Sequence, residues 1–229
     1  MKPTITAIVP MRHDSHRVPG KNWRTLAGRP LFCHIVESLY NSGVVSHVVI
    51  DTDSDTIRSI ARREFPQAVL LQRPDDLRDD RLSMNEVLLN TVRQLSGDLF
   101  LQTHSTNPLL TPGTISGTVK KFIDAMPQYD SLFTVTGLQT RLWDSFARPV
   151  NHDIAVLRRT QDLSPVFAEN SCLYAFTRQS LENYKNRIGG RPMMVELDRA
   201  EAWDIDTESD FTIAEALCAA GRTPAKIAA

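Results

Sequence analysis

Short β-branched runs alternate with amphipathic helical segments through the first 136 residues, and this alternation constrains the fold more than any other feature. The first run, residues 5–9, ends at Pro10 and suits a strand buried within a sheet. Further strands are predicted at residues 47–51, 68–72, 99–102 and 131–136. Helices of about 10–15 residues separate them, which favours right-handed crossovers and a mainly parallel sheet.

Helix starts and apolar spacing support this α/β class. Ser83, followed by Glu86, predicts a capping box at the start of one helix. Another helix should begin at Pro112 and turn four apolar side chains inward. These are Ile115, Val119, Phe122 and Met126. The last strong helix is predicted at residues 208–220.

The segment 137–170 breaks the rhythm of strands and helices. It is polar, contains several arginines and shows no apolar helical face. We therefore expect a protruding hairpin or arm, after which residues 172–176 return to strand. No linker or repeat divides the chain, so a single domain is expected over residues 1–229.

Composition excludes several classes of function. Lys and Arg total 26 and Asp and Glu total 27, a net charge of -1 that argues against nucleic acid or an anionic membrane as partner. No apolar run approaches the roughly 20 residues that a membrane helix needs. The three cysteines are widely spaced and odd in number, which indicates a reducing compartment and a cytoplasmic protein.

The loop after the first strand gathers charge. It contains the cations Arg12, Arg17 and Lys21, together with the small residues Ser15 and Gly20. Such a loop at the carboxyl end of a strand suits a polyphosphate. The patterns GxxxxGK[ST] and GxGxxG are both absent. A solvated basic loop with local ion pairs is the alternative.

Two acidic residues near the C-terminus have the spacing of a metal site. In an extended segment Asp204 and Asp206 point the same way, and paired carboxylates suit Mg²⁺ held together with phosphates. Alternatively, Asp206 or Thr207 caps the helix that follows.

The first loop resembles the P-A-R-x-x-S-K-R-x-P-G-K-N loop of the acylneuraminate cytidylyltransferase family. The matching residues are Arg12, Ser15, Arg17, Pro19, Gly20, Lys21 and Asn22. Met11 and His16 depart from the pattern. Residues 204–211 are similar to the D-I-D-T-E-x-D-F segment of the same family. In that family the loop holds the triphosphate of CTP.

Two further segments resemble the family on the nucleotide side. Residues 73–83 are similar to R-P-x-x-L-x-x-D-x-x-S, in which the matching residues are Arg73, Asp80 and Ser83. The resemblance implies that all three bind the nucleotide, with Arg73 and Ser83 close to the cytosine. For Arg73, a surface ion pair with a neighbouring aspartate is the alternative. Asp53, after the second strand, either orients the nucleotide or caps the next helix.

The acceptor side departs more from the family. Residues 102–109 resemble L-Q-P-T-S-P-L, so Thr106 and Asn107 match while His104 replaces a Gln that helps to place the acceptor. A turn residue and a general base are the other roles considered for His104.

The arm and the strand after it resemble R-R-Q-D and Y-E-N-G-S-x-Y. The acceptor-binding candidates here are Arg158, Arg159, Gln161, Glu169 and Asn170, and Ser171 stands where the family has Gly. Either arginine is expected to hold the acceptor carboxylate. A purely interfacial or solvated arm is the alternative.

The resemblance implies a three-layer, Rossmann-like nucleotide-diphospho-sugar transferase fold with a dimerisation arm. It also implies transfer of CMP from CTP to a sialic acid or related 2-keto-3-deoxy acid, with Mg²⁺ on Asp204 and Asp206. Arg12, Lys21 and Asp206 are the catalytic candidates. The alternatives are another nucleotide, another acceptor such as a phosphonate or phosphosugar, and a non-catalytic nucleotide-binding module.

Overall fold

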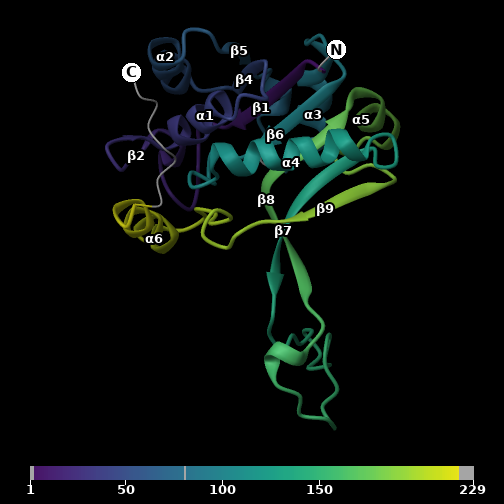
Figure 1. The fold of residues 1–229 in the computed structure, drawn as a ribbon. Helices are drawn as coiled ribbons and strands as arrows, with labels where there is room; N and C mark the ends of the chain where they lie inside the picture. The colour runs from purple at the N-terminus through teal and green to yellow at the C-terminus, as the bar shows by residue number, and fades with distance from the viewer. Residues whose placement is uncertain (1–2, 80, 222–229) are drawn as a thin grey trace.

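A seven-stranded sheet forms the centre of the protein (Figure 1). A computed structural model describes residues 3–79 and 81–221. Across the sheet the strands are β5 (Val69–Gln72), β4 (His47–Thr52), β1 (Ile5–Met11), β6 (Leu99–Thr103), β8 (Val166–Thr177), β7 (Ser131–Leu138) and β9 (Pro192–Glu196). Neighbours are parallel except where β8 runs antiparallel to β6 and β7. The predicted mainly parallel α/β fold is confirmed.

Helices cover both faces of this sheet. They are α1 (Leu31–Asn41), α2 (Asp55–Glu64), α3 (Met84–Arg93), α4 (Pro112–Ala125), α5 (Arg178–Tyr184) and α6 (Glu208–Ala219). One apolar cluster joins the strands to α1, α2 and α4, and another joins the opposite face to α3 and α5. Every residue of β1 is buried, because helices pack on both sides of it. None of the helices in the described ranges combines the length and apolar character needed to cross a membrane.

Most predicted elements form at the expected positions. The predicted capping box is present, with Ser83 accepting from the α3 backbone and Glu86 accepting from the Ser83 N–H. The inward position predicted for Met126 is wrong, because α4 ends at Ala125 and Met126 is extended and exposed. α5 and β9 were not predicted from the sequence, and both are short elements.

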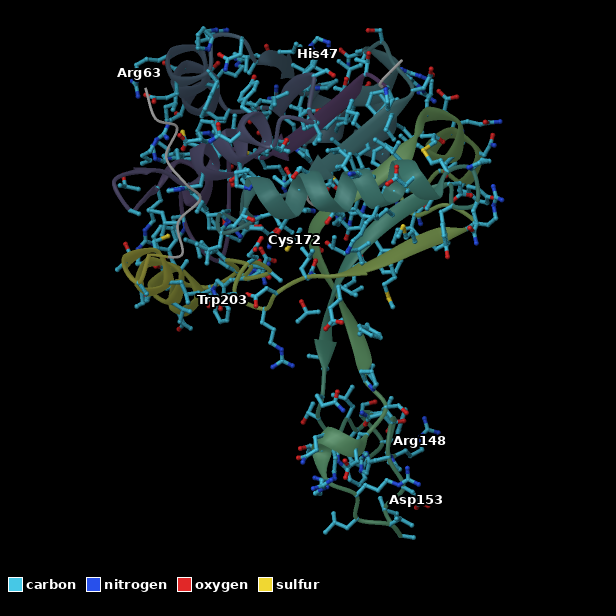
Figure 2. All side chains as sticks on the ribbon, viewed as in Figure 1. His47, Arg63, Arg148, Asp153, Cys172 and Trp203 are labelled. Carbon is cyan, nitrogen blue, oxygen red and sulfur yellow. The ribbon has the colours of Figure 1, made fainter. Side chains whose placement is uncertain are left out.

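The segment between β7 and β8 protrudes from the body of the molecule (Figures 1 and 2). The two strands leave the sheet as an antiparallel ribbon whose last pair is Leu138 and Val166. Beyond it, residues 139–165 form a compact tip, in which the Gln139 side-chain amide donates to the Leu163 carbonyl at 2.6 Å. Phe146 is 77% exposed and Leu157 is 88% exposed. The tip therefore presents apolar side chains that the chain itself does not cover.

Several loops meet beyond the carboxyl ends of the parallel strands. They include the loop after β1, with the short 3-10 helix η1 (Lys21–Trp23) and the hairpin of β2 (Thr25–Leu26) and β3 (Arg29–Pro30). The extended residues 203–206 pass along the loop after β6, where the Ile205 N–H donates to the Thr106 carbonyl at 2.9 Å. This edge is where α/β sheets bind ligands.

Candidate active site

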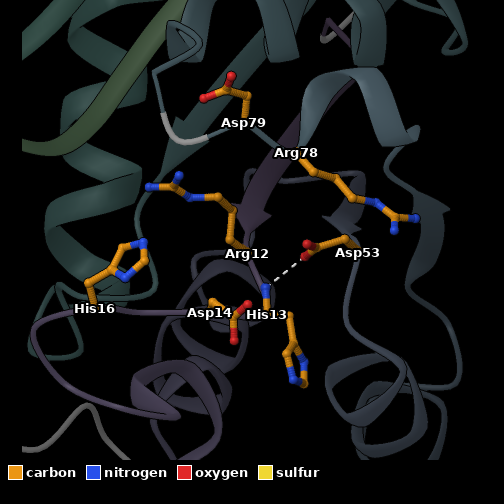
Figure 3. Close-up of a pocket in the computed structure, with 7 residues that line it drawn as sticks. All are labelled: Arg12, His13, Asp14, His16, Asp53, Arg78 and Asp79. Carbon is orange, nitrogen blue, oxygen red and sulfur yellow. Dashed lines mark hydrogen bonds between the residues drawn. The ribbon is translucent and has the colours of Figure 1, made fainter.

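Two adjoining cavities form one cleft at the carboxyl edge of the sheet. The larger, of about 620 Å³, is shown in Figure 3 and is lined by Arg12, His13, Asp14, His16, Asp53, Arg78 and Asp79. The smaller, of about 380 Å³, shares Arg12, Asp14 and His16 with it. The smaller cavity continues past Lys21 to His104 and Thr106. Its lining also includes Ser15, Arg17, Asn22 and Arg73.

The cationic loop owes its shape to Gly20 and Asn22. Gly20 has a φ of 65°, a left-handed conformation that suits glycine, and a Cβ there would lie 3.1 Å from the Trp23 indole nitrogen. The Asn22 amide donates to the Arg12 carbonyl at 2.9 Å, and its oxygen accepts from the Ser105 hydroxyl at 2.7 Å. These bonds engage both polar atoms of the Asn22 side chain, so this residue fixes the start of the loop against the next strand end.

Asp53 also holds the loop. Its carboxylate accepts a hydrogen bond from the His13 backbone N–H at 2.6 Å (Figure 3). The suggestion that Asp53 caps the following helix is wrong, because Ser54 is the N-cap of α2 and accepts from the Ile57 N–H. Asp53 thus faces the larger cavity while it restrains the backbone next to Arg12.

Asp206 lies against the cations of this loop. Arg17 donates to Asp206 Oδ1 at 2.7 Å, and Lys21 Nζ lies 3.5 Å from the same oxygen. Lys21 Nζ also donates to the Ile205 carbonyl at 2.6 Å. The loop after β1 and the segment before α6 therefore meet beside the cleft. Of the two alternative caps of α6, Thr207 is confirmed, because it is the N-cap and forms a capping box with Asp210, and Asp206 is not the cap.

Asp204 is the more deeply placed carboxylate of the pair. Its Oδ1 is buried without a hydrogen-bond partner, and its neighbour Ile205 is packed in an apolar cluster. Burial, aided by the charge of Asp206, raises the pKa of Asp204, while a hydrogen bond with Thr106 acts in the opposite direction. An unsatisfied carboxylate oxygen beside a second carboxylate fits a hard divalent cation.

The protein supplies only part of a coordination shell. Within residues 3–79 and 81–221, no three or more His, Cys, Asp and Glu side chains are grouped as metal ligands. A Mg²⁺ ion at Asp204 and Asp206 would need further oxygen ligands from phosphates or water, which is its usual mode of binding in nucleotide-dependent enzymes.

Arg73 and Ser83 lie on the side of the cleft near α3. Arg73 is 2% exposed and donates to Asp51 Oδ1 at 2.9 Å, so the proposed surface ion pair is wrong and the pair is buried. Thr91 hydrogen-bonds the other oxygen of Asp51. Ser83 is exposed at the start of α3, next to Met84 in the cavity lining. Asp80 lies outside the described residues.

The loop after β6 carries His104, Thr106 and Asn107. His104 lines the cleft, and its Nε2 is buried without a hydrogen-bond partner. Burial, followed by the charges of Arg187 and Lys21, lowers the pKa of His104 to about 4. Asn107 is fully buried and donates to the Trp203 carbonyl at 3.3 Å, so it supports the segment of the paired aspartates instead of facing the cleft.

The sequence is related to cytidylyltransferases over nearly its whole length. The sequence model of the family described as cytidylyltransferase matches residues 6–220. The chain belongs to the cytidylyltransferase family. This confirms the resemblance seen in the motifs, and it makes the chain a nucleotidyltransferase.

Two curated relatives illustrate the range of similarity. A pseudaminic acid cytidylyltransferase of Campylobacter jejuni is 26% identical over 221 residues, which cover 92% of this chain and 94% of the relative. N-acylneuraminate cytidylyltransferase A of Danio rerio is also 26% identical, over 92% of this chain and 50% of the relative.

Solved structures share the fold of this cytidylyltransferase. CMP:2-keto-3-deoxy-manno-octonic acid synthetase in complex with CTP superposes with a TM-score of 0.72 at 16% identity, over 95% of this chain and 99% of that one. A 4-diphosphocytidyl-2C-methyl-D-erythritol synthase from Anaerococcus prevotii superposes with a TM-score of 0.68 at 13% identity. The superposition covers 95% of this chain and 97% of that one.

Glu169 and Asn170 lie on β8 of this cytidylyltransferase, where the arm begins. The Asn170 side chain bonds Thr134 at 2.7 Å and Thr136 at 3.1 Å across to β7, so it stabilises an irregularity in the ladder. Ser171 has a φ of 57°, which explains why glycine suits this position of the family motif. Glu169 is exposed and accepts from the Tyr174 hydroxyl.

Arg158, Arg159 and Gln161 lie in the arm and do not join the cleft of their own chain (Figure 1). Arg159 pairs with Asp162 at 2.8 Å within the tip. Arg187, whose side chain is 15% exposed, was not predicted from the sequence as part of the site. No recognised motif contains this arginine, and the nearby Lys185 and Arg191 leave it without a distinctive signal in the sequence.

Proposed function

We propose that this cytidylyltransferase transfers CMP from CTP to a carboxylated 3-deoxy sugar acid and releases pyrophosphate. A sialic acid is the first candidate, with related nonulosonic and octulosonic acids next. The names of the relatives, which act on pseudaminic and N-acylneuraminic acids, support this substrate class. The single observation that carries the proposal is the contact of Lys21, which lines the cleft, with the Asp206 carboxylate.

The cationic loop would bind the triphosphate. Arg12, Arg17 and Lys21 carry three positive charges on one wall, where they neutralise the charge that develops on the departing pyrophosphate. Asp204 and Asp206 would hold Mg²⁺, which screens phosphate charge and lowers the pKa of a bound hydroxyl when present. The acceptor hydroxyl attacks the α-phosphorus in line, so most of the catalysis is positioning.

The nucleotide and the acceptor would lie at opposite ends of the cleft. Ser15, Arg73 and Ser83 are proposed on the cytidine side, with Asn22 holding the loop in place. His104 and Thr106 line the other end. Because His104 stays neutral above a pKa of about 4, it can hydrogen-bond the acceptor hydroxyl but is a weak base.

The arm suits a homodimer in which each copy completes the site of the other. Its exposed apolar side chains are Trp143, Phe146, Val150, Ile154, Val156 and Leu157. Such a cluster on a protruding segment favours burial against a second copy. Arg158, Arg159 and Gln161 would then contact the acceptor held by the partner. A cytoplasmic location agrees with the three unpaired cysteines.

A pyrophosphate-release assay tests the proposal directly. The purified protein is incubated with Mg²⁺, one of CTP, UTP, GTP or ATP, and a panel of acidic sugars. Release that needs both CTP and a sugar acid is expected. Equal release with another nucleotide would point to a different nucleotidyltransferase. Magnesium-independent binding of CTP without turnover on any acid would indicate a non-catalytic binding module.

A further inference from the structure

Arg187 is held by hydrogen bonds to two elements of the fold, α3 and β6. It lies in the loop between α5 and β9, and its backbone N–H donates to Asn85 Oδ1 on α3 at 3.0 Å. Its guanidinium Nη1 donates to Gln102 Oε1 on β6 at 2.6 Å. The side chain is only 15% exposed. Its position is therefore set by the fold, and it is no freely moving surface arginine.

Two residues of β8 complete its surroundings. The guanidinium carbon lies 3.6 Å from the centroid of the Tyr174 ring, a cation–π contact. Arg187 Nη2 lies 3.7 Å from Glu169 Oε1, and the Tyr174 hydroxyl donates to that same oxygen. We call Gln102, Glu169, Tyr174 and Arg187 the Arg187 cluster.

The Arg187 cluster adjoins the loop after β6, whose residue His104 lines the cleft. Gln102 lies on β6 two positions before His104, and its side chain is fully buried. Gln102 pairs with Tyr174 in the sheet register. Burial lowers the pKa of His104, and the charge of Arg187 acts in the same direction.

Glu169 keeps one oxygen available. The contacts from Tyr174 and Arg187 both reach Oε1, and in the described part of the chain no hydrogen bond is made to Oε2. The Glu169 side chain is 43% exposed. A carboxylate oxygen can only accept hydrogen bonds, so its ligand must carry a donor.

We propose that Arg187 is a positioning residue, which orients Glu169 to accept a hydrogen bond from a hydroxyl or acylamino N–H of the acceptor. This inference rests on the proposed transfer to a sugar acid. The acceptor carboxylate must lie away from Glu169, because like charges repel. Glu169 thus determines the orientation of the acceptor in the cleft.

Steady-state kinetics of Arg187→Ala, Glu169→Ala and the double variant test this role. Each single change should raise KM for the acceptor about tenfold, with KM for CTP within about twofold of wild type. Since Arg187 acts through Glu169, the double variant should resemble the single ones. The matched control is Arg63→Ala, an exposed arginine on α2 paired with Glu64, which should change neither constant.

Substrate analogues identify the donor. In each analogue, the acylamino group or one hydroxyl of the acid is replaced by hydrogen. For the analogue that lacks the group contacting Glu169, Glu169→Ala should no longer raise the acceptor KM. An unchanged acceptor KM in Glu169→Ala, or fully additive effects in the double variant, would overturn the inference. If Arg187→Ala does not fold, the acceptor KM of the exposed Glu169→Ala variant tests the inference. Absence of turnover in wild type with every acid would instead refute the proposed function itself.

Discussion

Lys21 and Asp206 are 185 positions apart in the sequence, yet Lys21 Nζ lies 3.5 Å from Asp206 Oδ1. Arg17 contacts the same oxygen at 2.7 Å. The cationic loop and the acidic pair therefore balance each other's charge in the absence of nucleotide. We expect phosphates to take over the two cations and to leave Asp206 free for a divalent cation.

Removal of either member of this pair should abolish most turnover without unfolding the chain. Lys21→Ala and Asp206→Asn each remove a charge that contacts phosphate or metal, and we expect kcat to fall by about 10²-fold or more. Pyrophosphate release gives the rate, and thermal melting tests folding. Lys120→Ala on α4 is the matched control and should behave as wild type. Near-normal rates in either site variant would refute the assigned roles.

Asp204→Asn should separate stability from activity. Burial raises the pKa of Asp204, so the folded state holds this proton more tightly than the unfolded state. The stabilising effect of protonation is lost as the pH rises through the raised pKa, and the ionised group destabilises the fold at pH 7.

Without Mg²⁺, the amide variant should therefore be more stable at pH 7 by about 1 kcal/mol, which is about 2–4 °C in Tm. The difference in Tm between the variant and wild type should vanish below the ordinary pKa of an aspartate, as melting curves at several pH values would show. The variant should also turn over poorly. A lower Tm at pH 7 would contradict the assigned environment of Asp204.

His104→Gln should leave the pH profile of turnover unchanged between pH 6 and 8. The pKa of about 4 keeps the imidazole neutral throughout this range. Because that pKa lies below the ordinary histidine value, the unfolded state takes up the proton first. Wild type should thus lose stability relative to His104→Gln as the pH falls from 6.5 to about 4. An inflection near pH 7 that disappears in the variant would identify His104 as a titrating base.

Ser171→Gly should stabilise the fold. Its φ of 57° is a left-handed conformation that costs a non-glycine residue roughly 1 kcal/mol. We expect Tm to rise by about 2–4 °C, measured by calorimetry. In Ser116→Gly, within helix α4, the same substitution should lower Tm because glycine weakens helix interiors. Equal effects at the two sites would show that the backbone of Ser171 is unstrained.

Leu157→Asp in the arm should dissociate the proposed homodimer. The residue is 88% exposed in the single chain, and a buried charge at an interface disfavours association. Light scattering is expected to change from dimer mass to monomer mass, with a loss of turnover. Ile213→Asp on α6, another exposed apolar residue, is the control. A fully active wild-type monomer would exclude shared sites.

Local sequence predicted the parts of the site whose chemistry is local. The capping box of Ser83 and Glu86 is confirmed, because four consecutive residues suffice to form it. The cationic loop also lines the cleft as expected, since it follows a buried strand. Met126 was misplaced because its apolar character fits the helix period, although α4 ends one residue before it.

The sequence by itself determined the α/β class, the cytidylyltransferase motifs and the charges at each end of the chain, because period, turn residues and charge are encoded over a few neighbouring positions. Only the tertiary structure decided that Arg73 is buried with Asp51, that Asn22 braces the loop, and that Arg187 reaches Glu169. The physical reason is that such partners come from distant strands. Their burial and pairing depend on the order in which the sheet assembles those strands, and no local pattern records that order.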